Sequence, residues 1–196
     1  MNNLAEAADE AARTLRDAEL RREQAIRYSR EMIRETKRMI HAIHAGEDHS
    51  ASKQELCRLA SELTAHFKDD RVTAGAGPAD DALAEYAEAM ILDSVVNKKS
   101  IPSFGDLGIT PGQWVLGLAD CLGEMRRVVL TSLISENIEI AASVFSDMEE
   151  MYLVIMAFDV PDAVLPVRRK QDIARGIMER TRTDITNAVM MSKIRK

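Results

Sequence analysis

The chain has 196 residues and a net charge of −6; hydrophobic residues make up 46% of it and charged residues 30%. This balance excludes a disordered chain, and the length fits one folded domain over residues 1–196. No apolar run approaches about 18 residues and the N-terminal stretch is acidic, so we expect neither a membrane span nor a signal peptide.

A long first helix is expected from about residue 4 to residue 45, ended by Gly46. The residues that repeat every seven positions along it are Ile26, Ile33 and Ile40, with Ser29, Thr36 and Ile43 interleaved. Such a repeat predicts a seam that packs along one neighbouring helix.

Five further helices are expected, separated by loops rich in glycine and proline at residues 71–78 and 97–112. They run from Ser50 or Ser52 to about Asp70, from residues 79–81 to about Val96, from Pro111 to Ser135, from Ile138 to Met156 and from Pro166 to Lys193. Thr110 is expected to cap the fourth helix before Pro111. No segment alternates as a strand does, so the sequence predicts an all-α antiparallel bundle of six or seven helices.

Two pairs of acids stand out because their helices are otherwise apolar. Glu85 and Glu88 are three residues apart, and Asp120 and Glu124 are four apart, so each pair shares one helix face. A charge there costs free energy unless it is paired or binds a metal. If the two helices pack with these faces together, the four carboxylates converge, and their oxygens suit Mg²⁺ or Mn²⁺.

The alternative is that each acid pairs with a nearby arginine, such as Arg126 or Arg127. A ferritin-like di-iron site is not expected, because neither acid pair has a histidine at Glu-x-x-His spacing. Gly117 and Gly123 lie beside the acids, and a glycine within a helix costs about 1 kcal/mol. We therefore expect a neighbouring helix or a ligand to approach closely there.

Basic residues are concentrated near both ends of the chain. Residues 13–45 carry a net charge of +4 and residues 168–196 a net charge of +6, whereas residues 46–167 carry −13. Two interpretations stay open, solvated helix faces or a surface that binds a polyanion. The candidate nucleic-acid-binding residues on the first helix are Arg21, Arg22, Arg30, Arg34, Lys37 and Arg38.

The two cysteines, Cys57 and Cys121, lie far apart within helical patterns. We expect both to be reduced thiols in the core of a cytoplasmic protein.

Four stretches, in chain order, resemble the translin family. They are residues 22–44 (REQAIRYSREMIRETKRMIHAIH), 85–89 (EYAEA), 117–127 (GLADCLGEMRR) and 165–172 (LPVRRKQD). The resemblance implies an all-α subunit and hollow homo-oligomers, often octamers, that enclose single-stranded RNA or DNA. Within the family, translin binds nucleic acid, whereas Trax carries the acids credited with metal-dependent endoribonuclease activity.

The Trax acids correspond to Glu85, Glu88 and Asp120, with Glu124 adjacent, so the chain looks closer to Trax. The resemblance therefore implies an endoribonuclease for single-stranded RNA in which these carboxylates hold one or two Mg²⁺ (or Mn²⁺) ions. Such an ion lowers the pKa of a water and offsets charge on the phosphate. Residues 71–82 are rich in glycine and alanine where translin has a His- and Arg-rich stretch, so the residues that hold RNA stay open.

Two alternatives are kept. One is a translin-like binding protein in which the acids are structural. The other is a helical nucleotide pyrophosphohydrolase, a class that also uses Glu-x-x-Glu, a second acidic helix and Mg²⁺.

Overall fold

The computed structural model describes residues 3–65 and 77–194, together with the backbone of residues 66 and 67. This part of the chain forms helices α1 (Leu4–Ala45), α2 (Ser50–Phe67), α3 (Pro78–Val96), α4 (Phe104–Leu107), α5 (Pro111–Ile134), α6 (Ile138–Met156) and α7 (Val167–Ile194). No strand occurs among the described residues, so the predicted all-α bundle is confirmed. The short helix α4 lies within the segment predicted as a loop, and most of the predicted loop at 71–78 lies outside the described residues.

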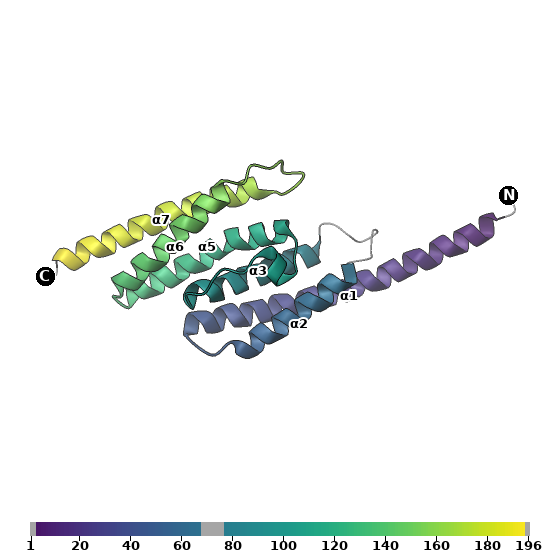
Figure 1. Ribbon diagram of the computed structural model, residues 1–196, viewed down its shortest axis with the longest axis horizontal. Helices are drawn as coiled ribbons and strands as arrows, with labels where there is room; N and C mark the ends of the chain where they lie inside the picture. Colours follow the sequence, from purple (N-terminus) through teal and green to yellow (C-terminus); the bar gives the residue numbers. More distant parts are fainter. Residues whose placement is uncertain (1–2, 68–76, 195–196) are drawn as a thin grey trace.

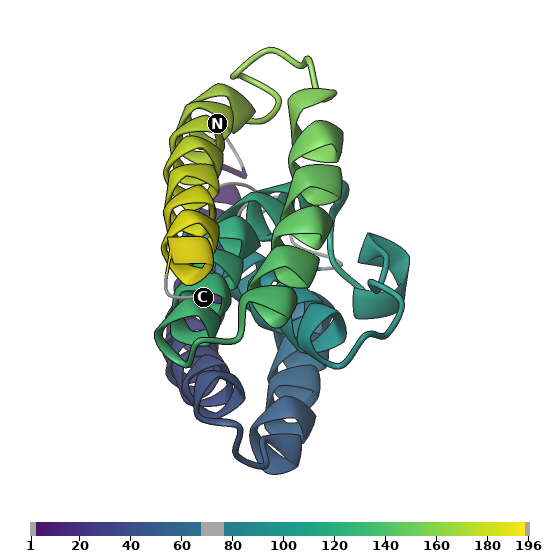
Figure 2. The ribbon, with the colours of Figure 1, turned by 90° about the vertical axis from the view of Figure 1, so that its left-hand side faces the viewer.

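The helices are arranged in three layers (Figures 1 and 2). Helices α3 and α5 pack together in the middle, α1 packs on α3 and α2, and α6 and α7 cover α5. The N-terminal part of α1 extends beyond the bundle at one end, and the C-terminal part of α7 extends at the other (Figure 1). The middle layer therefore holds both helices that carry the predicted acids.

The buried face of α1 lies next to the predicted seam rather than on it. Ala25, Met32 and Met39 repeat every seven residues and are buried, as are the interleaved Ser29, Thr36 and Ile43. The predicted Ile26, Ile33 and Ile40 are only partly buried. The predicted seven-residue repeat is therefore present, but the residues predicted at the centre of the buried face were wrong. Small and flexible side chains make the contact with the neighbouring helices, and the isoleucines flank it.

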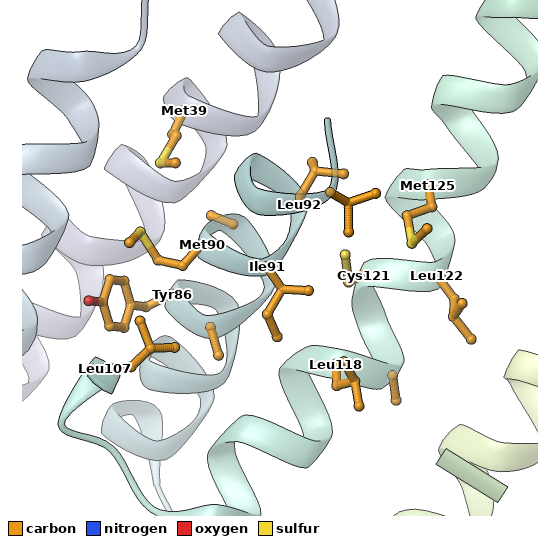
Figure 3. Close-up of a cluster of buried hydrophobic side chains, with 14 of the residues drawn as sticks. Met39, Tyr86, Met90, Ile91, Leu92, Leu107, Leu118, Cys121, Leu122 and Met125 are labelled. Atoms are coloured by element: carbon orange, nitrogen blue, oxygen red, sulfur yellow. The ribbon is translucent and has the colours of Figure 1, made fainter. Parts of the chain in front are cut away.

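Helices α3 and α5 approach each other closely at Gly117. A methyl group on this residue would lie 2.5 Å from the carbonyl oxygen of Ala84 and 2.7 Å from Cβ of Ala87. Beyond this contact, Ile91 and Leu92 of α3 and Cys121 of α5 lie among the buried side chains of the core (Figure 3). Helix α5 begins as predicted, with Thr110 accepting a hydrogen bond from the Gln113 amide and Pro111 in the first turn.

The cysteines differ from the sequence prediction in one respect. Cys121 is buried, but Cys57 is exposed, so only one of the two free thiols belongs to the core. On α7, the buried positions include the polar Gln171 and Thr181. No helix in the described part of the chain has the length and apolar character needed to cross a membrane.

Candidate functional site

The four predicted acids all lie in the middle layer, half-buried, two on each of its helices. Glu85 and Glu88 come from α3, and Asp120 and Glu124 come from α5. Burial raises the pKa of Glu88 to about 8, and the negative charges of Asp120, Glu124 and Glu85 add to that effect. The charges of Asp120 and Glu124 on α5 thus act on Glu88 across the contact between the two helices.

The pKa of Glu85 is raised for similar reasons. Burial raises the pKa of its carboxyl, the charge of Lys37 on α1 opposes the rise, and Asp120 and Asp81 add to it. In the described part of the chain neither Glu85 nor Glu88 makes a hydrogen bond or ion pair. The pair on α3 therefore has no direct partner that would stabilise its ionised form, and at a half-buried position this favours the protonated carboxyl.

The two acids of α5, in contrast, are each held by a residue of another helix. Lys170 of α7 donates to both oxygens of Asp120, with Nζ 2.6 Å from Oδ1 and 2.7 Å from Oδ2. His44, close to the end of α1, lies with Nε2 2.5 Å from Oε2 of Glu124, and only 7% of the His44 side chain is exposed. Four helices, α1, α3, α5 and α7, thus contribute to the site.

The arginines proposed as partners of the acids are placed differently. Arg126 donates to Thr181 and Asp184 on α7 and contacts none of the four acids, so this part of the alternative was wrong. Arg127 is 3.9 Å from Glu124, at the outer limit of an ion pair, and is exposed. The residues in closest contact with the acids of α5, Lys170 and His44, come from distant parts of the sequence.

The two glycines beside the acids have different surroundings. Gly117 meets α3 directly, next to the backbone nitrogen of Glu88, as predicted for a close helix approach. A methyl group on Gly123, between Asp120 and Glu124, would meet no atom within 4 Å. The space beside Gly123 is therefore open, and no helix in the described part of the chain fills it.

The acids suit a divalent cation by their chemistry, but their side chains are not arranged around one position. Within the described residues, no group of three or more His, Cys, Asp or Glu side chains is placed to hold a metal ion. Two of the carboxylates point to Lys170 and His44 instead. A cation at this site would require Asp120 or Glu124 to leave its present partner.

One face of α1 carries a row of basic side chains that leads to the acids. Arg30, Arg34, Lys37, His41 and His44 follow one another at steps of three and four residues, so they share that face. Arg30, Arg34 and Lys37 are exposed and form no ion pair within the described chain. At the end of this row, Lys37 acts on Glu85 and His44 contacts Glu124.

The remaining predicted basic residues of α1 lie elsewhere on the helix. Arg38 pairs with Glu35 one turn earlier. Arg21 is nine residues from Arg30, which is half a turn out of phase, so it belongs to the opposite side of the helix. Arg22 is exposed and lies further towards the N-terminus of α1.

Two other features of the fold are separate from the acids. A cavity of about 540 Å³ is lined by residues that include Lys98, Trp114, Met151 and Val154, and none of the four acids lines it. Asp93 near the end of α3 is buried and accepts hydrogen bonds from Lys53 (2.6 Å) and Asn97 (2.7 Å), with His49 at 2.6 Å. This second cluster joins α2 to α3.

The chain is similar in sequence to one known protein and in structure to several others. No protein-family model matches the chain. The uncharacterized protein MJ0175 of Methanocaldococcus jannaschii is 33% identical over 176 residues, which cover 89% of this chain and 79% of that protein.

Solved structures of proteins called C3PO have the same fold. The crystal structure of AfC3PO and the structure of its complex with duplex RNA match with a TM-score of 0.86 each, at 29% and 28% identity. Each match covers 94% of this chain, with 98% of the AfC3PO chain in the first structure and 97% in the complex. Apo-NeC3PO shares the fold with a TM-score of 0.82 at 24% identity, over 92% of this chain and 96% of its own.

The C3PO structures are translin and Trax structures, and they match this chain over nearly its whole length. With the archaeal relative that matches at 33% identity and the acids of both middle helices in place, the chain belongs to the translin family and is Trax-like.

Proposed function

We propose that this protein is a metal-dependent endoribonuclease that binds and cleaves single-stranded RNA. The observation that carries the proposal is the negative charge gathered around Glu88 from two packed helices. Ionised carboxylates in a half-buried position are unfavourable, and burial with three acidic neighbours raises the pKa of Glu88 to about 8. A divalent cation between the helices would offset this charge, and metal binding would then account for acids at half-buried positions.

Glu85, Glu88, Asp120 and Glu124 are the residues that would hold Mg²⁺ or Mn²⁺. Their donor set consists of carboxylate oxygens, which these ions prefer. When bound, the ion supplies a lowered pKa for a water and neutralisation of charge on the reacting phosphate. Glu85, Glu88 and Asp120 are the acids on which cleavage depends in this proposal.

The basic face of α1 supports RNA as the substrate class. Arg30, Arg34 and Lys37 offer three unpaired positive charges within a few turns, and the row ends at Glu85 and Glu124. A strand whose phosphates follow this face reaches the acids directly. AfC3PO forms a complex with duplex RNA, so both single-stranded and duplex RNA belong in the test, with single-stranded DNA as a further ligand.

We further propose that the subunits form a hollow homo-oligomer, with eight subunits as the expected number. The chain carries a net charge of −6, which opposes RNA binding on an open surface. An enclosed space lined by the basic face of α1 would concentrate positive charge where RNA lies.

A second function is favoured by one specific observation. Asp120 and Glu124 are already paired with Lys170 and His44, and no group of three or more acids, cysteines or histidines in the described residues is arranged for a metal. The second function is that of a translin-like protein, in which the acids stabilise the bundle and the protein binds nucleic acid without cleaving it.

Incubation of end-labelled single-stranded RNA with the protein separates the two functions. The proposal expects internal cleavage products with Mg²⁺ or Mn²⁺ and none with EDTA. Retained RNA binding with no cleavage under any divalent cation would select the binding protein. Hydrolysis of free nucleoside triphosphates with the RNA left intact would select a pyrophosphohydrolase.

A further inference from the structure

Lys170 lies on Asp120 in the way that a bound cation would. Its single ammonium is within hydrogen-bonding distance of both carboxylate oxygens, at 2.6 and 2.7 Å. The same charge also acts on Glu88, where it opposes the effect of the neighbouring acids. One lysine from α7 therefore compensates acids on both helices of the middle layer.

The surroundings of Lys170 combine a fixed backbone with a movable head group. The next residue, Gln171, is buried and donates to the carbonyl oxygens of Ile155 and Phe158, at 3.0 and 2.8 Å, which fixes the start of α7 against the end of α6. The Lys170 side chain is 31% exposed and that of Asp120 is 37% exposed. Since a lysine stem is flexible and its ammonium is a compact charge, the head group has room to move while its Cα stays in place.

We propose that Lys170 and a divalent cation exchange on Asp120. In the absence of the cation, Lys170 holds the carboxylate; when the cation binds, it takes over the Asp120 oxygens and displaces the ammonium towards solvent. This inference rests on the proposed function, because it assigns a role to Lys170 at that same site.

The exchange accounts for two observations together. It explains why acids suited to a metal are not arranged around a single position in the described chain, since one of them is oriented by the lysine. It also gives a role to a half-buried lysine that lies on Asp120, about one turn from Gly123, beside which the space is open. A purely structural ion pair would account for the contact, but it gives no role to the unpaired Glu85 and Glu88.

The test measures Mn²⁺ binding to the full-length protein by titration calorimetry without RNA. Lys170→Met removes the competing charge, so Mn²⁺ is expected to bind about fivefold or more tightly than to the unchanged protein. Lys98→Met is the matched control, because Lys98 forms an ion pair of similar length (2.7 Å) with Asp147, away from the acids. Lys98→Met is expected to leave the affinity for Mn²⁺ unchanged. Lys170→Gln serves as a second variant, and circular dichroism checks that each protein is folded.

The outcomes are separable. Mn²⁺ affinity that is equal or weaker in both Lys170 variants would overturn the exchange, while metal binding and cleavage by the unchanged protein would leave the proposed function standing. Absence of Mn²⁺ binding in every protein would refute the proposed function, and the exchange with it.

Discussion

Gly117 of α5 lies directly against Ala84 of α3, so close that a methyl group on the glycine would be 2.5 Å from the alanine carbonyl oxygen. The contact determines how near α5 comes to α3, and about one turn further along each helix lie the acids Glu88 and Asp120. The absence of a side chain at this one position therefore allows the two acidic faces to meet.

Substitution of this glycine gives the first prediction. Gly117→Ala should destabilise the fold by about 2–4 kcal/mol, because the methyl group meets backbone atoms of α3 that cannot move aside cheaply. Gly123→Ala is the matched control; its methyl group meets nothing within 4 Å, so it should stabilise α5 by about 0.5–1 kcal/mol. Urea unfolding followed by circular dichroism measures both changes. Equal effects of the two substitutions would show that the close contact does not limit the helix approach.

The buried cluster at Asp93 gives a prediction about pH. Burial alone pushes the pKa of Asp93 upward, but hydrogen bonds from Lys53 and His49 outweigh it and lower the pKa below 3.8. A lowered acid pKa stabilises the folded state above pH 3.8, and this stabilisation is lost as the pH falls through the folded value. Asp93→Asn should therefore cost about 2 kcal/mol at pH 7 and progressively less below about pH 3.8.

The check is a series of urea unfolding curves for both proteins between about pH 7 and about pH 2.5, a range that extends below the ordinary pKa of an aspartate carboxyl. A stability difference between them that stays constant over this range would contradict the assigned ionisation of Asp93.

The basic face of α1 gives a prediction about RNA affinity. Replacing Arg30, Arg34 and Lys37 together by glutamine should weaken RNA binding at low salt and reduce the slope of log affinity against log salt by about 2. The measurement is fluorescence anisotropy across a salt series, with Arg58→Gln as control, since Arg58 is an exposed residue of α2 paired with Glu55 and Glu62. If the triple variant keeps both its affinity and its slope, the RNA surface lies elsewhere, and the residues to replace next are Arg168, Arg169 and Lys170.

The ends of α1 and α7 give a prediction about assembly. Leu4, Leu15 and Leu20 of α1 are 60–64% exposed, and Met190 and Met191 of α7 are 60% and 58% exposed. The N-terminal part of α1 and the C-terminal part of α7 extend beyond the bundle (Figure 1). Such apolar surface favours association. Light scattering should give eight times the subunit mass of 21.8 kDa at micromolar concentration. A mass equal to one subunit would refute the oligomer.

The sequence allowed most of the fold to be predicted, because long amphipathic helices leave a local signal. Helix α6 was predicted with its observed ends, and the capping residue Thr110 gave the start of α5. The buried face of α1 was predicted one position away from the observed one, because Ala25 and Met32 are less hydrophobic than the neighbouring isoleucines. Only the packing of α1 on α2 and α3 decides which side is buried.

The candidate site was predicted only in part, for a different reason. The spacing of the acids identified both acidic faces, since residues three and four apart share a helix face. Their partners Lys170 and His44 were missed, although both lie in the stretches that resemble the translin family. They are separated from their acids by 50 and 80 residues, respectively. No local pattern relates residues so far apart. Of the two nearby arginines considered as partners, only Arg127 lies near an acid, 3.9 Å from Glu124.

The role of the acids in cleavage is best tested with Glu88→Gln. Glutamine keeps the shape of the side chain and removes only its ability to ionise, and because burial raises the pKa of Glu88 to about 8, the variant should be at least as stable as the unchanged protein without metal. The measurement is the rate of single-stranded RNA cleavage with Mg²⁺ at RNA concentrations that saturate both proteins. We expect a folded variant that binds RNA and cleaves it about a hundredfold or more slowly. Cleavage at an undiminished rate would refute a catalytic role for Glu88 and leave the acids with a structural one.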